Sequence, residues 1–422
     1  MNNAHAKVDH LRGGHTLLVD ERGDGQELLI AGTIRAQIAA GGAVVIVGPS
    51  INDALLEAMI EASQLVGRGS DIMVVNPAKP ATSHTYNPVL HTAPAKVASH
   101  VLNFIADQEA EGIQNPLITG ALLEAIVSSL QLLGVPYSFL DLGMFVMKPD
   151  AITALADHMT IEHPYSSELQ ALTQAIGAFH DTEGGLSSDL LKEQFSGLAG
   201  SMCMMGSGRA GEVFNSYMPD VVLHEALSTG KIIYLAIPYV GRGSAAANLR
   251  RIVISNLSEA IDRISALPCS IPALAVFTDA GGCNAPAIEQ LLSAEKEPIM
   301  NVWVSAGSLD DLGRESLDLR ETCISKARSI VFFKPASLKS VDLYLKFLPQ
   351  EDANQEARDR LLVLSSSEFV AVSAGHPLHW GDARTAMTLS SVRGAPVILE
   401  RPVRHYHAPL SGADKFTQTM PV

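Results

Sequence analysis

The residues with the clearest chemical potential lie in one acidic turn near the start of the chain. The apolar run HTLLV leads into this turn, and a helical pattern follows it. The turn reads Asp20, Glu21, Arg22, Gly23, Asp24, Gly25, Gln26, Glu27. A Gly-rich turn between a strand and a helix is a common phosphate-binding structure, because backbone amides and the helix N-terminus face the anion. The arrangement therefore indicates a place where a nucleotide could sit.

The side chains of the turn do not suit a nucleotide. On the pattern G-x-x-x-x-G-K-[ST], Asp20 replaces the first glycine, Gln26 the lysine that reaches the phosphates, and Glu27 the hydroxyl that binds magnesium. A carboxylate 4 Å from a phosphate charge costs about 4 kcal/mol at an effective dielectric of about 20. With four carboxylates in the turn, ordinary Mg-ATP binding is not expected. The alternative is that residues 21–25 form only a solvated turn.

The second half of a nucleotide site would follow a later strand. Such sites place an aspartate at the strand end and often a glutamate beside it that polarises water. The run ALAVFTD ends in Asp279, and Ala280 follows it. The aspartate on the metal side is kept while the catalytic acid is missing, although Asp279 could equally cap the following turn.

Short β-branched and apolar runs predict the elements that position these residues. Helical patterns between them favour an α/β fold with a mostly parallel, doubly wound sheet. The predicted strands are residues 15–19, 43–48, 71–75, 231–238, 273–279, 301–306 and 329–333.

The stretch 92–225 interrupts this alternation with helix after helix, one of them predicted to start with a capping box of Ser167 and Gln170. We predict an all-α domain, 92–225, inserted into an α/β domain of residues 1–91 plus 226–395, because residues 1–91 hold too few strands for a sheet. Two domains in series are the alternative. Residues 396–422 are predicted to be an extended tail.

Composition narrows the class of protein. The 422 residues are 47% hydrophobic and 18% charged, which is typical of a globular chain. A net charge of −15 disfavours binding to DNA or an anionic membrane. The four cysteines are scattered, so neither a disulfide framework nor a metal site is expected. No apolar run approaches about 18 residues, and we expect a soluble, cytoplasmic chain.

Several longer segments resemble the coupling ATPases of conjugation and type IV secretion, the TraD/TraG-like motors. The similarity spans residues 14–335. Besides HTLLV and its turn, it includes DIMVVNPAKPATSHTYNPVL, KIIYLAIP, PALAVFTDAGG, NVWVSAGSLDDL and RESLDLRETCISKARSIVFFK. The resemblance implies a RecA-like domain of P-loop type that carries an inserted all-α domain.

The resemblance also implies a degenerate nucleotide site. Gln26 replaces the P-loop lysine, Glu27 the magnesium-binding hydroxyl, Ala280 the Walker B glutamate and Gly307 the sensor glutamine. The remaining positions of that site are Asp20, Gly23, Asp24, Gly25 and Asp279. We therefore expect a pseudo-ATPase with no bound cofactor.

Three functions remain open at this point. The first is a non-catalytic scaffold or adaptor of conjugative DNA transfer or type IV secretion, peripheral to an inner-membrane complex. Its partners would be proteins of that apparatus, such as an active coupling ATPase or the relaxosome. The second is an active DNA-translocating coupling ATPase with an unorthodox site for ATP and Mg²⁺. The third is a module that binds another anion through the C-terminal arginines. The oligomeric state is left open.

Overall fold

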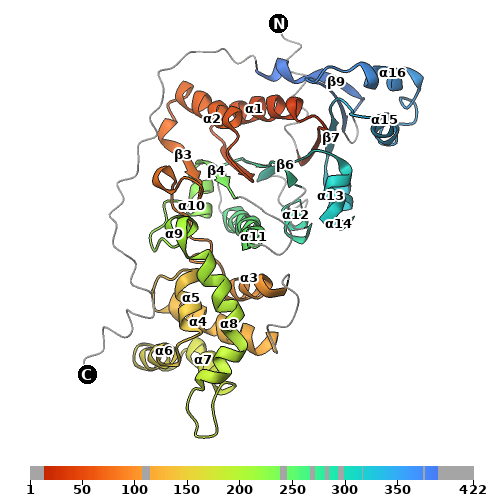
Figure 1. Cartoon of the computed structure of the whole chain (residues 1–422). Coiled ribbons are helices and arrows are strands. Elements are labelled where there is room, and N and C mark those ends of the chain that lie inside the picture. The colour runs from red at the N-terminus through yellow and green to blue at the C-terminus, as the bar shows by residue number, and fades with distance from the viewer. Residues whose placement is uncertain are drawn as a thin grey trace. The chain divides into compact units, whose positions relative to one another are not determined.

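The computed structural model describes residues 14–106, 115–237, 245–266, 271–280, 285–292, 299–315, 317–373 and 376–387 (Figure 1). Contacts divide the chain into two compact units. Of the described residues, the α/β unit comprises those in 1–74, 223–239 and 254–387, and the α unit comprises those in 75–222 and 240–253. The boundaries predicted from the sequence stay a prediction, and the predicted tail lies outside the described residues.

A sheet of nine strands forms the α/β unit within the described ranges, in the order β3-β4-β2-β5-β6-β1-β7-β8-β9. The pairs from β4 to β7 in this order are parallel, whereas β7, β8 and β9 pair antiparallel. The predicted α/β class with a mostly parallel sheet is confirmed. The strands are β1 (Thr16–Val19), β2 (Ala43–Gly48), β3 (Ile72–Val75), β4 (Ile232–Ala236), β5 (Ala273–Phe277), β6 (Met300–Ala306), β7 (Ser329–Phe332), β8 (Glu368–Ser373) and β9 (His379–Asp382).

Seven of these strands match the seven predicted runs, and β8 and β9 were missing from the prediction. The seven are recognisable because buried parallel strands leave continuous apolar runs. β9 is half-buried at every position, so its sequence HWGD carries no such run. The strands β8 and β9 extend the sheet beyond β7 by antiparallel pairing.

Strand register brings the predicted site positions to one edge of the sheet. Val19 at the end of β1 is level with Ala306 on β6 and Phe332 on β7. Phe277 at the end of β5 is level with Val304, two residues before the end of β6. Because parallel strands share their carboxyl edge, the segments after β1, β5, β6 and β7 all leave the sheet there.

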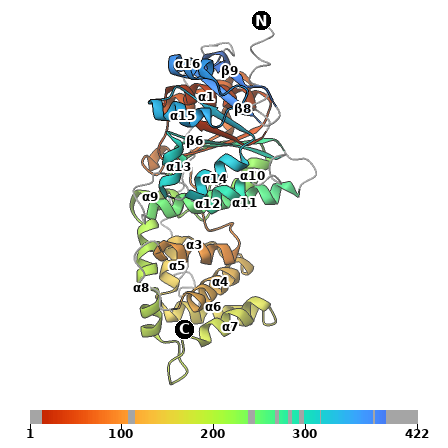
Figure 2. The same ribbon diagram turned by 90° about the vertical axis from the view of Figure 1, so that its right-hand side faces the viewer.

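Helices cover both faces of this sheet. Figures 1 and 2 place α1 and α2 on one face, and α10, α12 and α14 on the other. The apolar core beneath α1 and α2 is fully buried, with Leu29, Ile34, Ile46 and Leu55 among its members. The helices of the unit are α1 (Asp24–Ala39), α2 (Asp53–Leu65), α10 (Leu223–Ser228), α12 (Ala285–Leu291), α13 (Leu309–Glu315), α14 (Leu317–Lys326), α15 (Leu338–Leu345) and α16 (Gln355–Val363), and α11 (Ala245–Ser265) belongs to both units.

A charged cluster fastens the opposite, amino-terminal edge of the sheet. The Arg68 guanidinium donates to the carbonyl oxygens of Ile38 and Gly42 at 3.0 and 3.2 Å, and to the Asp71 carboxylate at 3.1 Å. The Lys231 ammonium donates to the same carboxylate at 2.8 Å. Burial alone would raise the pKa of Asp71, but the hydrogen bonds and charges of Lys231 and Arg68 outweigh it and lower that pKa.

The α unit is built from seven helices between residues 94 and 214 in the part of the chain that the structure describes. They are α3 (Pro94–Ala106), α4 (Pro116–Leu132), α5 (Phe139–Phe145), α6 (Pro149–Glu162), α7 (Ser167–Gly177), α8 (Ser188–Met205) and α9 (Gly208–Phe214). No described helix of either unit combines the length and apolar content that crossing a bilayer requires.

The predicted capping box at α7 is wrong by one residue. The residue before the helix is Ser166, whose extended backbone lets its hydroxyl accept from the Leu169 amide at 3.2 Å. Ser167 is already helical, and its hydroxyl donates to the Glu168 carboxylate at 3.1 Å. A reciprocal capping box is present instead at α5, between Ser138 and Asp141.

The asparagine of the YNP segment ties the α unit together. The Asn87 side chain donates to the carbonyl oxygens of Tyr137 and Ser216 at 2.8 and 2.9 Å. Its own oxygen accepts from the amides of Val89 and Leu90 at 3.1 and 3.2 Å. One buried side chain thus joins three segments that are distant in sequence.

Replacement of Asn87 by alanine should destabilise the protein by about 2–4 kcal/mol, because buried donors and acceptors lose their partners. Urea unfolding followed by circular dichroism measures the change. The exposed Gln170→Ala on α7 is the control and should stay within about 0.5 kcal/mol of the parent. Equal stabilities of the two variants would contradict the role assigned to Asn87.

The Asp71 cluster predicts an acid-sensitive contribution to stability. Because the folded pKa lies below the ordinary value of 3.8, the contribution is complete only well above pH 3.8 and is lost as the pH falls through the folded pKa. Asp71→Asn should therefore lower the free energy of unfolding at pH 7, and the difference from the parent should shrink towards pH 2. A difference that is constant from pH 7 to pH 2 would contradict this linkage.

Candidate functional site

The carboxylate of Asp20 occupies the amides that the turn would offer to a phosphate. Asp20 is only 2% exposed. Its Oδ2 accepts from the amides of Gly25 and Gln26 at 2.8 and 2.9 Å, and its Oδ1 accepts from the Arg22 amide at 3.1 Å. The chain's own carboxylate thus sits where an external anion would bind.

This arrangement also caps α1. The residue before the helix is Gly23, with φ at 86°, and it has no side chain that could cap. Asp20 supplies the missing acceptor from three residues further back and places a negative charge at the positive end of the helix dipole. The Asp20 amide itself donates to the Ala306 carbonyl at 3.1 Å, which fixes the exit from β1 against β6.

Segments from far along the chain pack against the turn. Gly25 is buried, and a Cβ atom at this position would overlap the backbone oxygen of Ser366 and the ring of Phe333. Phe333 directly follows β7, is fully buried and lies 5.7 Å from the Phe369 ring, centroid to centroid. Position 25 therefore requires a glycine, because Ser366 and Phe333 approach its backbone too closely for a side chain.

The two glutamates of the turn hold neighbouring elements. The Glu21 carboxylate accepts from the Ala336 amide at 2.6 Å and from the Ser340 hydroxyl at 2.9 Å, which ties the turn to the start of α15. Burial, followed by the negative charges of Glu21 and Asp20, raises the pKa of Tyr344 on the same helix. Glu21 therefore serves as a structural anchor.

Glu27, at the position of the magnesium-binding hydroxyl, is hydrogen-bonded to the start of the neighbouring helix α2. Its Oε1 accepts from the Asn52 side-chain amide at 2.6 Å. The Asn52 oxygen caps α2 by accepting from the Leu55 amide at 3.1 Å, and the Asn52 backbone amide donates to the Tyr234 hydroxyl at 2.9 Å. Burial raises the pKa of Tyr234 to about 12, so this phenol stays protonated.

The segment after β5 presents Asp279 to solvent. Asp279 is exposed and has a left-handed backbone with φ at 57°, whereas Ala280 is fully buried. The register places Asp279 about level with Val19 but two strands away, a lateral separation of about 10 Å. A carboxylate, that of Asp279, therefore follows β5 at the carboxyl edge of the sheet, whereas Ala280 beside it has no functional group.

The segment after β6 is used for a helix cap. The Ser308 hydroxyl accepts from the Asp311 amide at 3.1 Å and donates to the Asp311 carboxylate at 2.8 Å, at the start of α13. A Cβ atom on Gly307 would lie 3.0 Å from that carboxylate. The predicted sensor position, Gly307, therefore has no side chain and lies beside this helix cap.

The structure gathers the turn positions Asp20, Gly25, Gln26 and Glu27 at one corner, with the segments of Asp279 and Gly307 along the same sheet edge. Among the described residues, no group of three or more His, Cys, Asp or Glu side chains is arranged to hold a metal. The donor set does not fit Mg-ATP: the amides are engaged, and no lysine or hydroxyl stands at 26 or 27.

Sequence reasoning missed two contributions to the site. The motif comparison treats Asp20 as a lost glycine and as one of four repelling carboxylates, although an aspartate shortly before a helix is a recognisable capping signal. The covering residues Phe333 and Ser366 and the anchoring contact of Glu21 carry no local signal, because they depend on chain segments about 300 residues away.

Comparisons with known proteins agree with the fold. No family model and no curated protein matches the sequence. Among solved structures, the bacterial conjugative coupling protein TrwBΔN70 in complex with sulphate is 14% identical, with 87% of this chain and 85% of that chain covered and a TM-score of 0.56. The plasmid coupling protein TrwB in complex with the GTP analogue GDPNP is 13% identical, with the same coverage and a TM-score of 0.53.

VirB4 of Thermoanaerobacter pseudethanolicus is 14% identical, with 86% of this chain and 87% of that chain covered and a TM-score of 0.50. At such identities the likeness establishes the fold. The predicted RecA-like architecture and the resemblance to coupling ATPases of conjugation and type IV secretion are thus confirmed at the level of the fold.

The buried Asp20 carboxylate should contribute strongly to stability. Asp20→Ala leaves three amides without their acceptor and removes the charge that caps α1, so we expect a loss of about 2–4 kcal/mol in the free energy of unfolding. Glu351→Ala, at an exposed position after α15, is the matched control and should change stability by less than about 0.5 kcal/mol. An Asp20 variant as stable as the control would contradict the capping role.

Proposed function

We propose that this chain is a non-hydrolysing protein of the coupling-ATPase fold that acts as a scaffold or adaptor in conjugative DNA transfer or type IV secretion. The observation that carries the proposal is the Asp20 carboxylate on the amides of Gly25 and Gln26. The similarity to conjugative coupling proteins and to VirB4 supports a role in this type of apparatus.

A phosphate bound at this turn would lie next to the Asp20 carboxylate. A phosphate charge within 4 Å of Asp20 is repelled by about 4 kcal/mol at an effective dielectric of about 20, which corresponds to roughly a thousandfold in affinity. Gln26 offers no positive charge in return, and Glu27 adds a carboxylate where a magnesium-binding hydroxyl is needed. Every one of these replacements opposes nucleotide binding.

A built-in anion has a second consequence. In a nucleotide-dependent turn the helix N-terminus depends on the ligand for part of its hydrogen bonding, whereas here Asp20 supplies it permanently. The corner between β1 and α1 then keeps one conformation regardless of ATP. Such a subunit suits a constant structural role beside other proteins of the apparatus, including an active coupling ATPase or the relaxosome.

One observation favours a second candidate, an active DNA-translocating ATPase with an unorthodox site. Asp279 keeps a carboxylate at the end of β5 and is exposed. Two of the TrwB structures are complexes with nucleotides, one with GDPNP and one with ADP and Mg²⁺. In this alternative the bound cofactor would be ATP with Mg²⁺.

Calorimetry and an ATPase assay on the purified chain separate the two candidates. We expect no Mg-ATP binding at millimolar nucleotide and no phosphate release above buffer, for the parent and for Asp279→Asn alike. ATP hydrolysis by the parent that Asp279→Asn abolishes would overturn the non-hydrolysing proposal.

The scaffold role has its own test in the native host. Deletion of the gene should abolish transfer by the apparatus, and the Asp279→Asn chain should restore it to the parental level, because no hydrolysis is needed. The Asn87→Ala chain, which is predicted to be destabilised, is the control for a loss of folded protein. Failure of a stably expressed Asp279→Asn chain to restore transfer would favour the motor.

The blocked turn can also be reopened by design. The triple change Asp20→Gly, Gln26→Lys and Glu27→Thr rebuilds the positions of a phosphate-binding turn. We expect sulfate or Mg-ADP to raise the melting temperature of this variant by several degrees and to leave the parent and Gln26→Lys unchanged. A parent chain that sulfate or Mg-ADP stabilises as much as the triple variant would show that Asp20 does not block the turn.

A further inference from the structure

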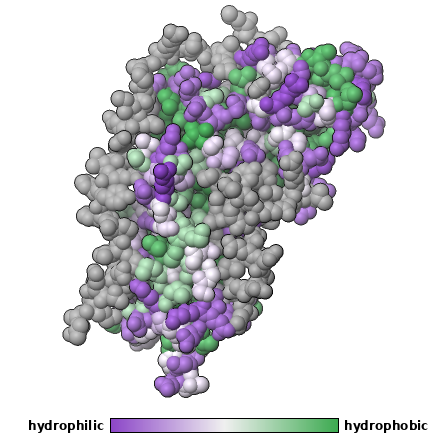
Figure 3. Space-filling view, in the orientation of Figure 1, coloured by the Kyte–Doolittle hydropathy of each residue, from purple (hydrophilic) through white to green (hydrophobic). Residues whose placement is uncertain are grey.

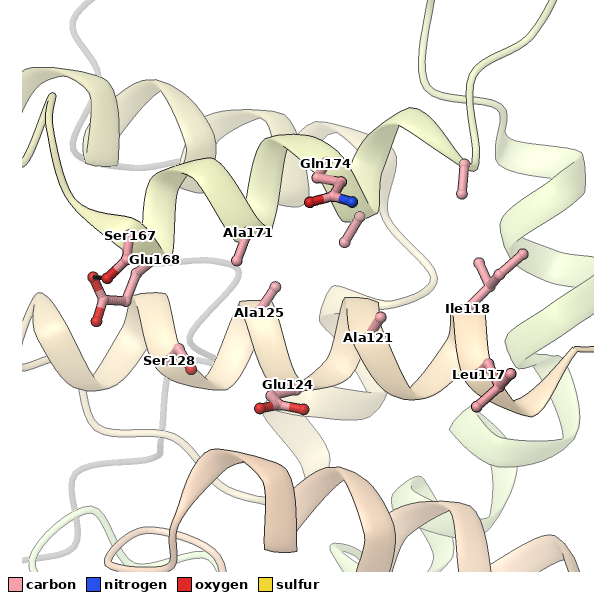
Figure 4. Close-up of a pocket in the computed structure, with 12 residues that line it drawn as sticks. Leu117, Ile118, Ala121, Glu124, Ala125, Ser128, Ser167, Glu168, Ala171 and Gln174 are labelled. Carbon is pink, nitrogen blue, oxygen red and sulfur yellow. Dashed lines mark hydrogen bonds between the residues drawn. The ribbon is translucent and has the colours of Figure 1, made fainter.

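The helices α4 and α7 of the α unit border a groove that plays no part in the proposed function so far. It has a volume of about 590 Å³, within the usual range of ligand clefts. Figure 4 shows the two helices side by side and antiparallel, with Ser128 opposite Ser167 at one end and Leu117 and Ile118 at the other.

Small side chains give the groove its depth. Ala121 and Ala125 lie one turn apart on α4, and Ala171 and Ala175 lie one turn apart on α7. Figure 4 shows Ala121, Ala125 and Ala171 lining the space between the helices. Because alanine leaves the space between two helix backbones unfilled, an apolar channel runs along the pair. Leu117 at its end is 86% exposed, which leaves an uncovered apolar anchor.

The charge at the rim of the groove has one sign. Glu124 of α4 is exposed and Glu168 of α7 is half-exposed, and the residues that line the groove include no lysine or arginine. The segment 116–177, which spans α4 to α7, has six Asp and Glu, of which Asp141 is buried and five reach the surface, and one lysine. In Figure 3 hydrophilic residues gather over the end of the α unit where α6 and α7 lie. This surface repels nucleic acid and anionic lipid.

We propose that the groove between α4 and α7 binds an amphipathic basic helix of a partner protein. The apolar face of that helix would lie on the alanine floor and against Leu117, with side chains at helical spacing as anchors. Its lysines or arginines would pair with Glu124 and Glu168. The site is complementary in both shape and charge to such a helix, and it does not depend on whether the chain binds a nucleotide.

Two designed helical peptides test the proposal with the full-length chain. Both carry the same leucine and alanine face, and the polar face carries lysine in one and glutamate in the other. Fluorescence anisotropy should show that the lysine peptide binds, that added salt weakens the binding, and that the glutamate peptide binds at least about tenfold more weakly. No binding of the lysine peptide, or equal binding of the two peptides, would overturn the proposal.

Variants of the chain locate the binding. The double variant Glu124→Lys with Glu168→Lys should bind the lysine peptide about tenfold more weakly. The matched control, Asp189→Lys with Glu212→Lys, makes the same charge change at exposed positions of α8 and α9 and should change the affinity less than about twofold. Equal effects of the two pairs would mean that only the overall charge matters, which contradicts a specific groove.

A steric variant gives an independent readout. Ala171 is exposed, so Ala171→Trp should fill the groove and abolish peptide binding while the thermal unfolding curve stays unchanged. The charge-reversal pair keeps the proposal testable if the tryptophan variant is unstable.

Two further measurements identify other occupants of the groove. If deletion of residues 388–422 tightens peptide binding tenfold or more, the chain's own segment fills the groove and the proposal is overturned. Self-association that Ala171→Trp abolishes would assign the groove to a second copy and would likewise overturn it. We expect neither result.

Discussion

The hydrogen bonds from the Gly25 and Gln26 amides to the Asp20 carboxylate determine how the first strand and helix of the α/β unit meet. A strand that runs into a helix leaves the first helical amides without partners, and an anion is the usual solution. In this chain the anion is covalently part of the turn. The amides of Gly25 and Gln26 are therefore hydrogen-bonded to a carboxylate of the fold itself.

The neighbouring carboxylates extend the same principle. Glu21 holds the start of α15, and Glu27 holds the cap of α2 through Asn52. The acidic turn looks like an excess of negative charge in sequence, but these two glutamates and Asp20 each accept hydrogen bonds from a different part of the unit. The strand ends keep the arrangement of the coupling-ATPase fold, while Asp20, Glu21 and Glu27 serve structural purposes.

Strands β1 to β7 could be predicted because buried parallel strands appear in the sequence as continuous apolar runs. The half-buried β9 lacks such a run, and β8 follows a cluster of serines, so both were missed. At the site, motif spacing predicts replaced positions at 26, 27 and 280, and the family resemblance adds position 307. The packing of Phe333 and Ser366 against Gly25 could not, because these residues lie about 300 positions further along the chain.

An experimental structure determined with millimolar Mg-ATP tests the central claim most directly. We predict that the Asp20 carboxylate remains hydrogen-bonded to the amides of Gly25 and Gln26, and that the turn carries no density for a nucleotide. A structure in which Asp20 has turned outward and ATP phosphates accept hydrogen bonds from those two amides would contradict the claim.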